Sequence, residues 1–113
     1  MDKTRLEHML QAVRFILRHT AFMEEDEFYR SDVLKFAIIK QLEILGEAAN
    51  FLSDELLERY RQVAWGKIVG ARNIYVHEYF QISWLLVWEI IKDDIPELEK
   101  QLQEIINELN QDL

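Results

Sequence analysis

The chain of 113 residues contains no cysteine, one proline and three glycines. The missing cysteines exclude a disulfide scaffold and a zinc site with thiolate ligands. The longest apolar run, from Ile82 to Ile91, is interrupted by Ser83 and Glu89 and is shorter than the ~18 residues of a membrane span. Charged residues at the start of the chain are unlike a secretory signal. We therefore expect a cytoplasmic protein with no membrane contact.

Several catalytic motifs are also missing. The sequence has no glycine-rich phosphate loop, no exposed-serine elbow and no Glu-x-x-His pair. These absences argue against phosphate-loop nucleotidases, serine hydrolases and di-iron bundles. We expect no cofactor and no metal, and the length predicts a single domain over residues 1–113.

Positive charge is scarce, and its distribution is uneven. Lys and Arg number 13 against 21 Asp and Glu, giving a net charge of −8, which argues against a protein that coats nucleic acid. The segment from Arg59 to His77 carries four cations and no acid, and it is the only plausible anion site in the sequence. Acids concentrate at residues 24–32 and from Asp93 onward, where they favour solubility or offer a surface to a basic partner.

Apolar residues recur every three or four positions along most of the chain, which is the spacing of one helical face, and no strand alternation is present. We expect Thr4 and Glu7 to form a capping box at the first helix, and serines to cap three later helices. The expected helices are Thr4 to about Met23, a helix capped by Ser31 through Leu52, a helix capped by Ser53 or Asp54 to Tyr60, Trp65 to about Val76, a helix capped by Ser83 over Trp84 to Lys92, and a last one restarted at Asp94 and Pro96. The pattern predicts an all-α, up-and-down bundle of four to five helices. The chemistry discussed below leads us to expect that it is dimerising.

The segment Gly70 to Tyr79 holds the remaining candidates for chemistry. Asn73 and His77 are four residues apart and share a helical face, whereas Arg72 and His77 converge only if the helix frays at His77. A neutral imidazole can then take the proton of a ribose 2′-hydroxyl while the guanidinium holds the phosphate, so RNA is cut without a metal and DNA is spared.

The leaving oxygen of that reaction also needs a proton, and each chain supplies one suitable histidine. A twofold dimer would bring a second copy of the same corner across its axis. The residues alone leave a simpler alternative open, because Arg and His near a helix end commonly cap its last carbonyls. A non-catalytic binding module and a plain dimeric scaffold also stay open.

The spacing of Arg72, four residues, His77, one residue and Tyr79 resembles the signature of the HEPN superfamily. The flanking segments Leu42–Ala48 and Ile68–Asn73 narrow the resemblance to HepT, the HEPN toxin that is encoded beside a minimal nucleotidyltransferase antitoxin called MntA.

This resemblance implies a homodimeric, metal-independent endoribonuclease that acts as the toxin of a type VII-like toxin–antitoxin pair. It implies that Arg72 and His77 are catalytic. We expect Tyr79, and Asn73 on the helical face of His77, to support them. It further implies that an MntA-like nucleotidyltransferase silences the toxin by transferring AMP to Tyr79. The alternative within the family is a non-catalytic HEPN subunit that binds nucleotide or the transferase.

Overall fold

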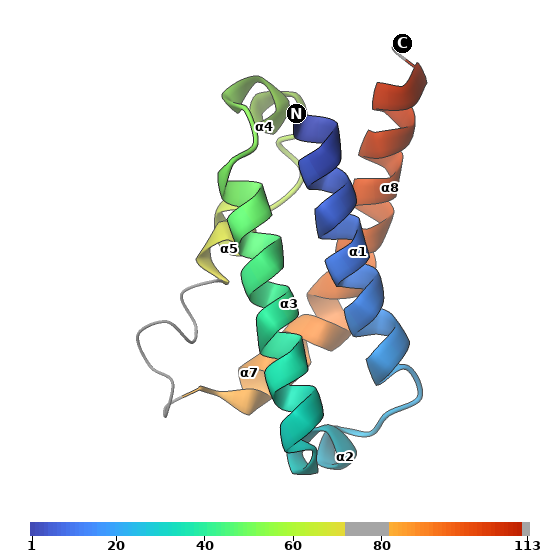
Figure 1. Cartoon of the computed structure of the whole chain (residues 1–113), viewed down its shortest axis with the longest axis vertical. Helices are drawn as coiled ribbons and strands as arrows, with labels where there is room; N and C mark the ends of the chain where they lie inside the picture. Colours follow the sequence, from blue (N-terminus) through green and yellow to red (C-terminus); the bar gives the residue numbers. More distant parts are fainter. Residues whose placement is uncertain (72–81, 112–113) are drawn as a thin grey trace.

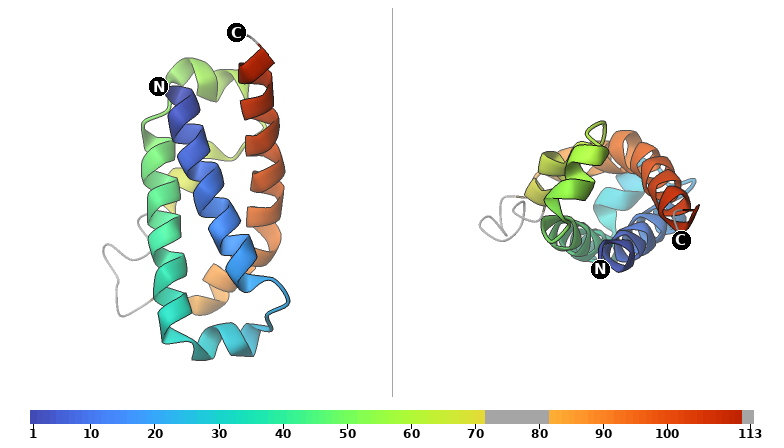
Figure 2. Two further views of the ribbon diagram at one scale, coloured as in Figure 1. Left: turned by 45° about the vertical axis from the view of Figure 1, so that its right-hand side comes forward. Right: turned by 90° about the horizontal axis from the view of Figure 1, so that it is seen from above.

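Three long helices form the frame of the molecule (Figure 1). The computed structural model describes residues 1–71 and 82–111. Helix α1 (Asp2–Thr20) contacts both α3 (Asp32–Asn50) and α8 (Ile95–Gln111) and runs opposite to them. Figure 2 shows the start of α1 and the end of α8 at the same end of the molecule. The described residues contain no strand, so the all-α prediction is confirmed for them.

The core lies where the apolar stripes of the three long helices meet. The stripes predicted from helical spacing are confirmed for most of their members. The predicted members that are only partly buried are Leu17, Leu34, Ile44, Ala48 and Leu109. Side chains from the short elements complete the core. The buried members on the long helices are Leu6, Met9, Leu10, Val13 and Ile16 on α1, Ile38, Ile39, Leu42, Leu45 and Ala49 on α3, and Leu98, Leu102, Ile105 and Ile106 on α8.

Helix α1 starts earlier and ends earlier than the sequence predicts. It begins at Asp2, so Thr4 lies inside the first turn and the predicted Thr4–Glu7 capping box is wrong. The Asp2 carboxylate instead accepts hydrogen bonds from the Ser53 amide at 3.0 Å and the Ser53 hydroxyl at 2.6 Å. The helix stops at Thr20, and Phe22 in the following turn has a φ of 62°. Because that conformation cannot continue a right-handed helix, the predicted extension to Met23 is wrong.

The acidic stretch after α1 forms a helix of its own. Helix α2 (Glu25–Arg30) is closed by a capping box in which the Glu24 amide donates to the Glu27 carboxylate at 3.1 Å. Phe28 is 1% exposed and anchors this helix to the core. The sequence predicts no helix here, because one buried residue among acids gives no periodic signal.

The three predicted serine caps are confirmed. The hydroxyls of Ser31, Ser53 and Ser83 each accept a hydrogen bond from the amide three residues on, at 3.2, 3.2 and 3.3 Å. They begin α3, α4 (Asp54–Arg59) and α7 (Trp84–Glu89), respectively. A serine oxygen satisfies an amide that the first helical turn leaves without a partner.

Helix α7 continues into α8 without the predicted restart at Asp94 and Pro96. The joining turn, η2 (Ile90–Asp94), is π-helical, and the Ile95 amide donates to the Ile90 carbonyl. The wider turn accommodates Pro96, which lacks an amide proton and would crowd the carbonyl four residues before it in a regular α-helix. The π turn therefore replaces the expected break.

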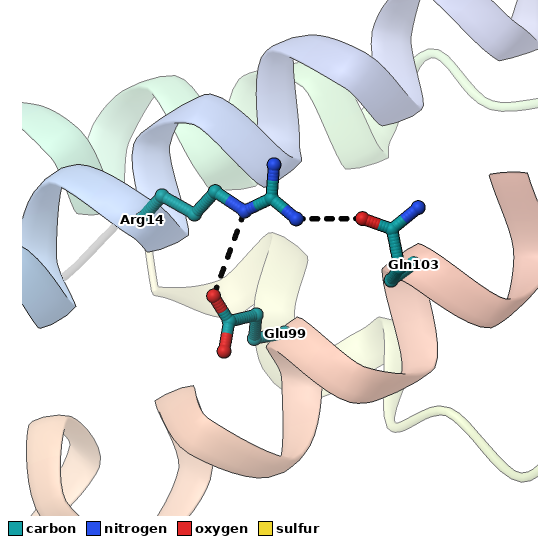
Figure 3. A network of polar contacts seen from close by, with 3 residues as sticks. All are labelled: Arg14, Glu99 and Gln103. Carbon is teal, nitrogen blue, oxygen red and sulfur yellow. Dashed lines mark hydrogen bonds and ion pairs between the residues drawn. The ribbon is translucent and has the colours of Figure 1, made fainter.

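A polar contact joins the exposed edges of α1 and α8 (Figure 3). The Arg14 guanidinium donates to the Gln103 side-chain oxygen at 2.6 Å and lies 3.5 Å from the Glu99 carboxylate. Among the described residues, no helix is long and apolar enough to cross a membrane.

Candidate functional site

All four predicted site residues, Arg72, Asn73, His77 and Tyr79, lie outside the described residues, within 72–81. The predicted helix from Trp65 is present as α5 (Trp65–Gly70), and its expected continuation to Val76 falls outside the described part. The structure does describe how the chain enters and leaves this stretch, which we call the signature segment.

The entry to the signature segment is anchored by hydrogen bonds. The indole nitrogen of Trp65, which is buried, donates to the Tyr60 carbonyl at 2.9 Å. The Tyr60 hydroxyl in turn donates to the Glu108 carboxylate of α8 at 2.5 Å. At the other end of α5 the Ala71 amide bonds the carbonyls of Lys67 and Ile68, both at 3.1 Å. The backbone is thus fixed up to the residue before Arg72.

The exit is anchored by aromatic packing. Trp84 begins α7, and its ring centroid lies 6.2 Å from that of Phe28 and 6.1 Å from that of Phe36, with the ring edges meeting the faces. The Lys35 ammonium sits between the Tyr29 and Trp84 rings, 4.7 and 4.8 Å from their centroids. Edge-to-face pairs and cation–π contacts of this kind favour one orientation of the rings. The exit from the signature segment is therefore held against α2 and α3.

A cleft of about 230 Å³ opens beside Ala71, between α3, α5 and the η2–α8 junction. We call it the α5–η2 cleft. Its apolar wall comes from Leu42, Leu45, Ile68, Ile90, Ile95 and Leu98, and its polar lining from Gln62, Lys67, Asp93, Asp94, Glu97 and Gln101. A second hollow shares Lys67, Ala71, Ile90, Asp93 and Asp94 with it and adds Gly70, Leu86 and Glu89.

The charge around this cleft is more negative than the sequence predicts for the segment from Arg59 to His77. The window from Arg59 to His77 is free of acids along the chain, but η2 brings two carboxylates against it in space. Lys67 pairs with Asp94 at 3.0 Å, and Asp93 lies beside it in the same lining. Within the described residues, Lys67 is thus already compensated and is not a free anion site. The π turn places these carboxylates, and the position of Pro96 in the sequence did not predict that turn.

Two histidines and a paired carboxylate are found on α1 and α3. His8 and His19 are both exposed on α1, and the His19 ring packs 4.2 Å from that of Phe15. Glu43 on α3 pairs with Lys40 at 3.2 Å. In the described part of the chain, no three His, Asp or Glu side chains are grouped as a metal site would need.

Large apolar side chains are exposed where α2, the start of α3 and α7 come together. We call this group the corner patch; it comprises Tyr29, Val33, Phe36, Leu85 and Leu86, exposed by 58, 85, 43, 59 and 46%. The patch adjoins the exit from the signature segment through Trp84, and Leu86 lines the hollow beside Gly70 at the entry. Exposed large apolar side chains mark an interaction site where they join into one surface.

Comparison with known proteins decides the family. The family model described as "Ribonuclease HepT-like" matches residues 9–105. The chain belongs to this family. A protein of Caldanaerobacter subterraneus subsp. tengcongensis named "Putative RNase TTE0752" is 40% identical over 101 residues, covering 89% of this chain and 90% of the relative.

Two further relatives carry names of the same kind. The Methanocaldococcus jannaschii protein "Putative RNase MJ1380" is 33% identical and covers 89% of this chain and 93% of the relative. The Thermococcus cleftensis protein "Probable ribonuclease HepT" is 26% identical over 91% of this chain and 94% of the relative. No solved structure matches the chain. The resemblance inferred from the signature and its flanks is confirmed at the level of the family.

Proposed function

We propose that this HepT-like chain is a metal-independent endoribonuclease in which Arg72 and His77 are the catalytic residues. The observation that carries the proposal is the Arg72-x₄-His77-x-Tyr79 spacing in a chain whose family is that of a ribonuclease. The backbone anchors at Ala71 and Ser83 support it, because they fix both ends of the signature segment on the helical frame.

The proposed reaction is an internal transesterification. Neutral His77 removes the proton of a ribose 2′-hydroxyl, whose oxygen attacks the adjacent phosphorus. The bond from phosphorus to the 5′-oxygen of the next nucleotide breaks, leaving a 2′,3′-cyclic phosphate and a 5′-hydroxyl that must gain a proton. Arg72 donates hydrogen bonds to the phosphate oxygens as negative charge builds on them. Asn73 and Tyr79 support the two catalytic groups.

We further propose a homodimer of single-domain chains, in which the second copy supplies the protonated imidazole for the leaving oxygen. An isologous interface presents the same residues from both copies. A dimer formed through one face near the signature segment would therefore bring the two catalytic sites together. The corner patch favours this arrangement, since burying its apolar side chains would stabilise association at about 25 cal/mol per Å².

Regulation by an MntA-like nucleotidyltransferase antitoxin completes the proposal, which makes the chain the toxin of the pair. The Tyr79 hydroxyl attacks the α-phosphorus of ATP, pyrophosphate leaves, and the phenolic proton passes to a base or to solvent. The attached AMP adds bulk and negative charge near Arg72, where it competes with an RNA phosphate for the guanidinium donors.

The decisive experiment incubates single-stranded RNA with the purified chain in excess EDTA. We expect cleavage by the wild type, loss of at least ~100-fold with His77→Ala because a general base is removed, and no change with His8→Ala or His19→Ala. Arg72→Lys should also impair cleavage, because an ammonium cannot make two parallel hydrogen bonds to a phosphate. Cleavage that persists in His77→Ala, or that requires a divalent metal, would contradict the proposed mechanism.

The regulatory part has its own readout. Treatment with the antitoxin and ATP should raise the mass of the wild-type chain by one AMP and stop cleavage, while Tyr79→Phe stays unmodified. If the unmodified wild type binds the antitoxin but never cleaves RNA, the chain is instead the non-catalytic subunit.

A further inference from the structure

We infer that the α5–η2 cleft is a docking site for a basic, amphipathic segment of a protein partner. The inference goes beyond RNA cleavage and does not depend on it. It starts from the combination of an apolar wall and a strongly acidic rim in the same cleft.

The apolar wall is part of the hydrophobic core. Leu42, Leu45, Ile95 and Leu98 on the wall are at most 5% exposed and belong to the core that joins α3 to α8. A volume of about 230 Å³ is below the roughly 300–1,000 Å³ of pockets for drug-sized ligands. The cleft suits one or two apolar side chains of an incoming segment.

The rim sets the charge of that segment. Asp93, Asp94 and Glu97 line the cleft, and Glu89 lines the adjoining hollow. In the described part of the chain, Lys67 is the one cation among these residues, and its ion pair with Asp94 at 3.0 Å is partly exposed on both sides. Asp93 and Glu97 make no ion pair with any described residue, so they are available to cations from outside.

This charge excludes other occupants of similar shape. A nucleic acid would bring phosphates against Asp93 and Glu97, two carboxylates without a described ion pair, which repel them. A second copy is also a poor match, since the chain has a net charge of −8 and carries few cations to offer. A segment with leucine-like side chains on one face and Lys or Arg beside them satisfies both the wall and the rim, as helix-in-groove recognition does elsewhere.

Docking here would bear directly on the signature segment. Ala71 lines the cleft and immediately precedes Arg72. A bound segment therefore lies against the residue that leads into the predicted catalytic stretch.

The test uses the full chain and a fluorescein-labelled helical peptide with Leu on one face and Lys and Arg on the other, followed by fluorescence anisotropy. The triple variant Asp93→Asn, Asp94→Asn, Glu97→Gln should bind it about tenfold more weakly, as expected for the loss of a few surface ion pairs. The matched control Glu7→Gln, Glu25→Gln, Glu104→Gln removes three exposed acids that do not line the cleft, and should change binding less than about twofold because distant surface charges are screened.

A second pair of variants tests the cavity itself. Gln101→Trp fills the cleft and should weaken binding at least as much as the acid triple, while Gln11→Trp on the exposed face of α1 should not. Equal losses in the two acid triples would show that only net charge matters, and unchanged binding by Gln101→Trp would show that the cleft is not occupied. A second copy of the chain is the remaining possible occupant, and sedimentation analysis of the same variants tests it. Loss of a dimer in the cleft variants alone would assign the cleft to that second copy. Each of these three results would overturn the inference.

Discussion

Alanine at Gly66 should stabilise the protein, because nothing in the described structure requires glycine there. A Cβ added at Gly66 would meet no atom within 4 Å, and the described glycines include none with positive φ. Glycine inside a helix costs roughly 0.5–1 kcal/mol relative to alanine. Since Gly66 is in the first turn of α5, the lower half of that range is the better expectation.

The size of the thermal shift follows from the length of the chain. Unfolding entropy of roughly 2.1 cal/mol/K per residue near 60 °C gives about 0.24 kcal/mol/K for a chain of this length. A gain of about 0.5 kcal/mol therefore raises Tm by about 2 °C. Differential scanning calorimetry at low protein concentration measures this directly. Gly46→Ala is the contrast, because Gly46 is buried in α3, where we expect an added methyl group to overpack the site and lower Tm.

The functional half of the same experiment asks what the open face of α5 is for. If RNA or a second copy approaches the backbone at Gly66, the Ala variant is more stable yet cleaves RNA more slowly. A Tm that falls at every protein concentration would refute the reasoning, because it would show that the added methyl group is not in open space.

Two more stability predictions rest on single features of the fold. Phe22→Asn should raise Tm by a few degrees in calorimetry. Phe22 is fully exposed and has a φ of 62°, a conformation that asparagine adopts at a cost lower by about 1 kcal/mol. An unchanged or lower Tm would mean that Phe22 makes a contact that stabilises the fold by more than its backbone strain costs. Arg14→Met should lower the free energy of unfolding by only about 0.5 kcal/mol in low salt, because the contacts of Arg14 with Glu99 and Gln103 are largely exposed. Urea titrations at low and high salt should show that this loss shrinks with salt, and a salt-independent loss would point to packing of the Arg14 stem instead.

Local signals in the sequence predicted most of the frame. The serine caps at Ser31, Ser53 and Ser83 were predictable because each depends on a hydrogen bond within one helical turn. The three long apolar stripes were predictable because helical spacing alone fixes which residues share a face. The start of α1 could not be predicted from local signals, because the hydrogen-bond partner of Asp2 is Ser53, which lies far along the chain.

The candidate site divides in the same way. The Arg72, His77 and Tyr79 signature and the family could be read from spacing, and the family is confirmed by the comparisons. The carboxylates beside Lys67 could not be foreseen, because they reach it through the π turn before Pro96 and not through any sequence motif. The roles of Arg72, Asn73, His77 and Tyr79 stay predictions.

This arrangement of charge constrains how an RNA strand can reach the proposed site. Along the sequence, Lys67 and Arg72 look like neighbouring phosphate contacts, but Asp94 already neutralises Lys67 and Asp93 lies next to it. Screening at physiological salt acts over about 8 Å, so a phosphate held at Lys67 would feel both carboxylates. We therefore expect no phosphate of the proposed substrate to bind at Lys67. The carboxylates beside Lys67 suit a basic protein partner better than a nucleic acid, so the charge at the entry to the signature segment favours a regulator over the substrate.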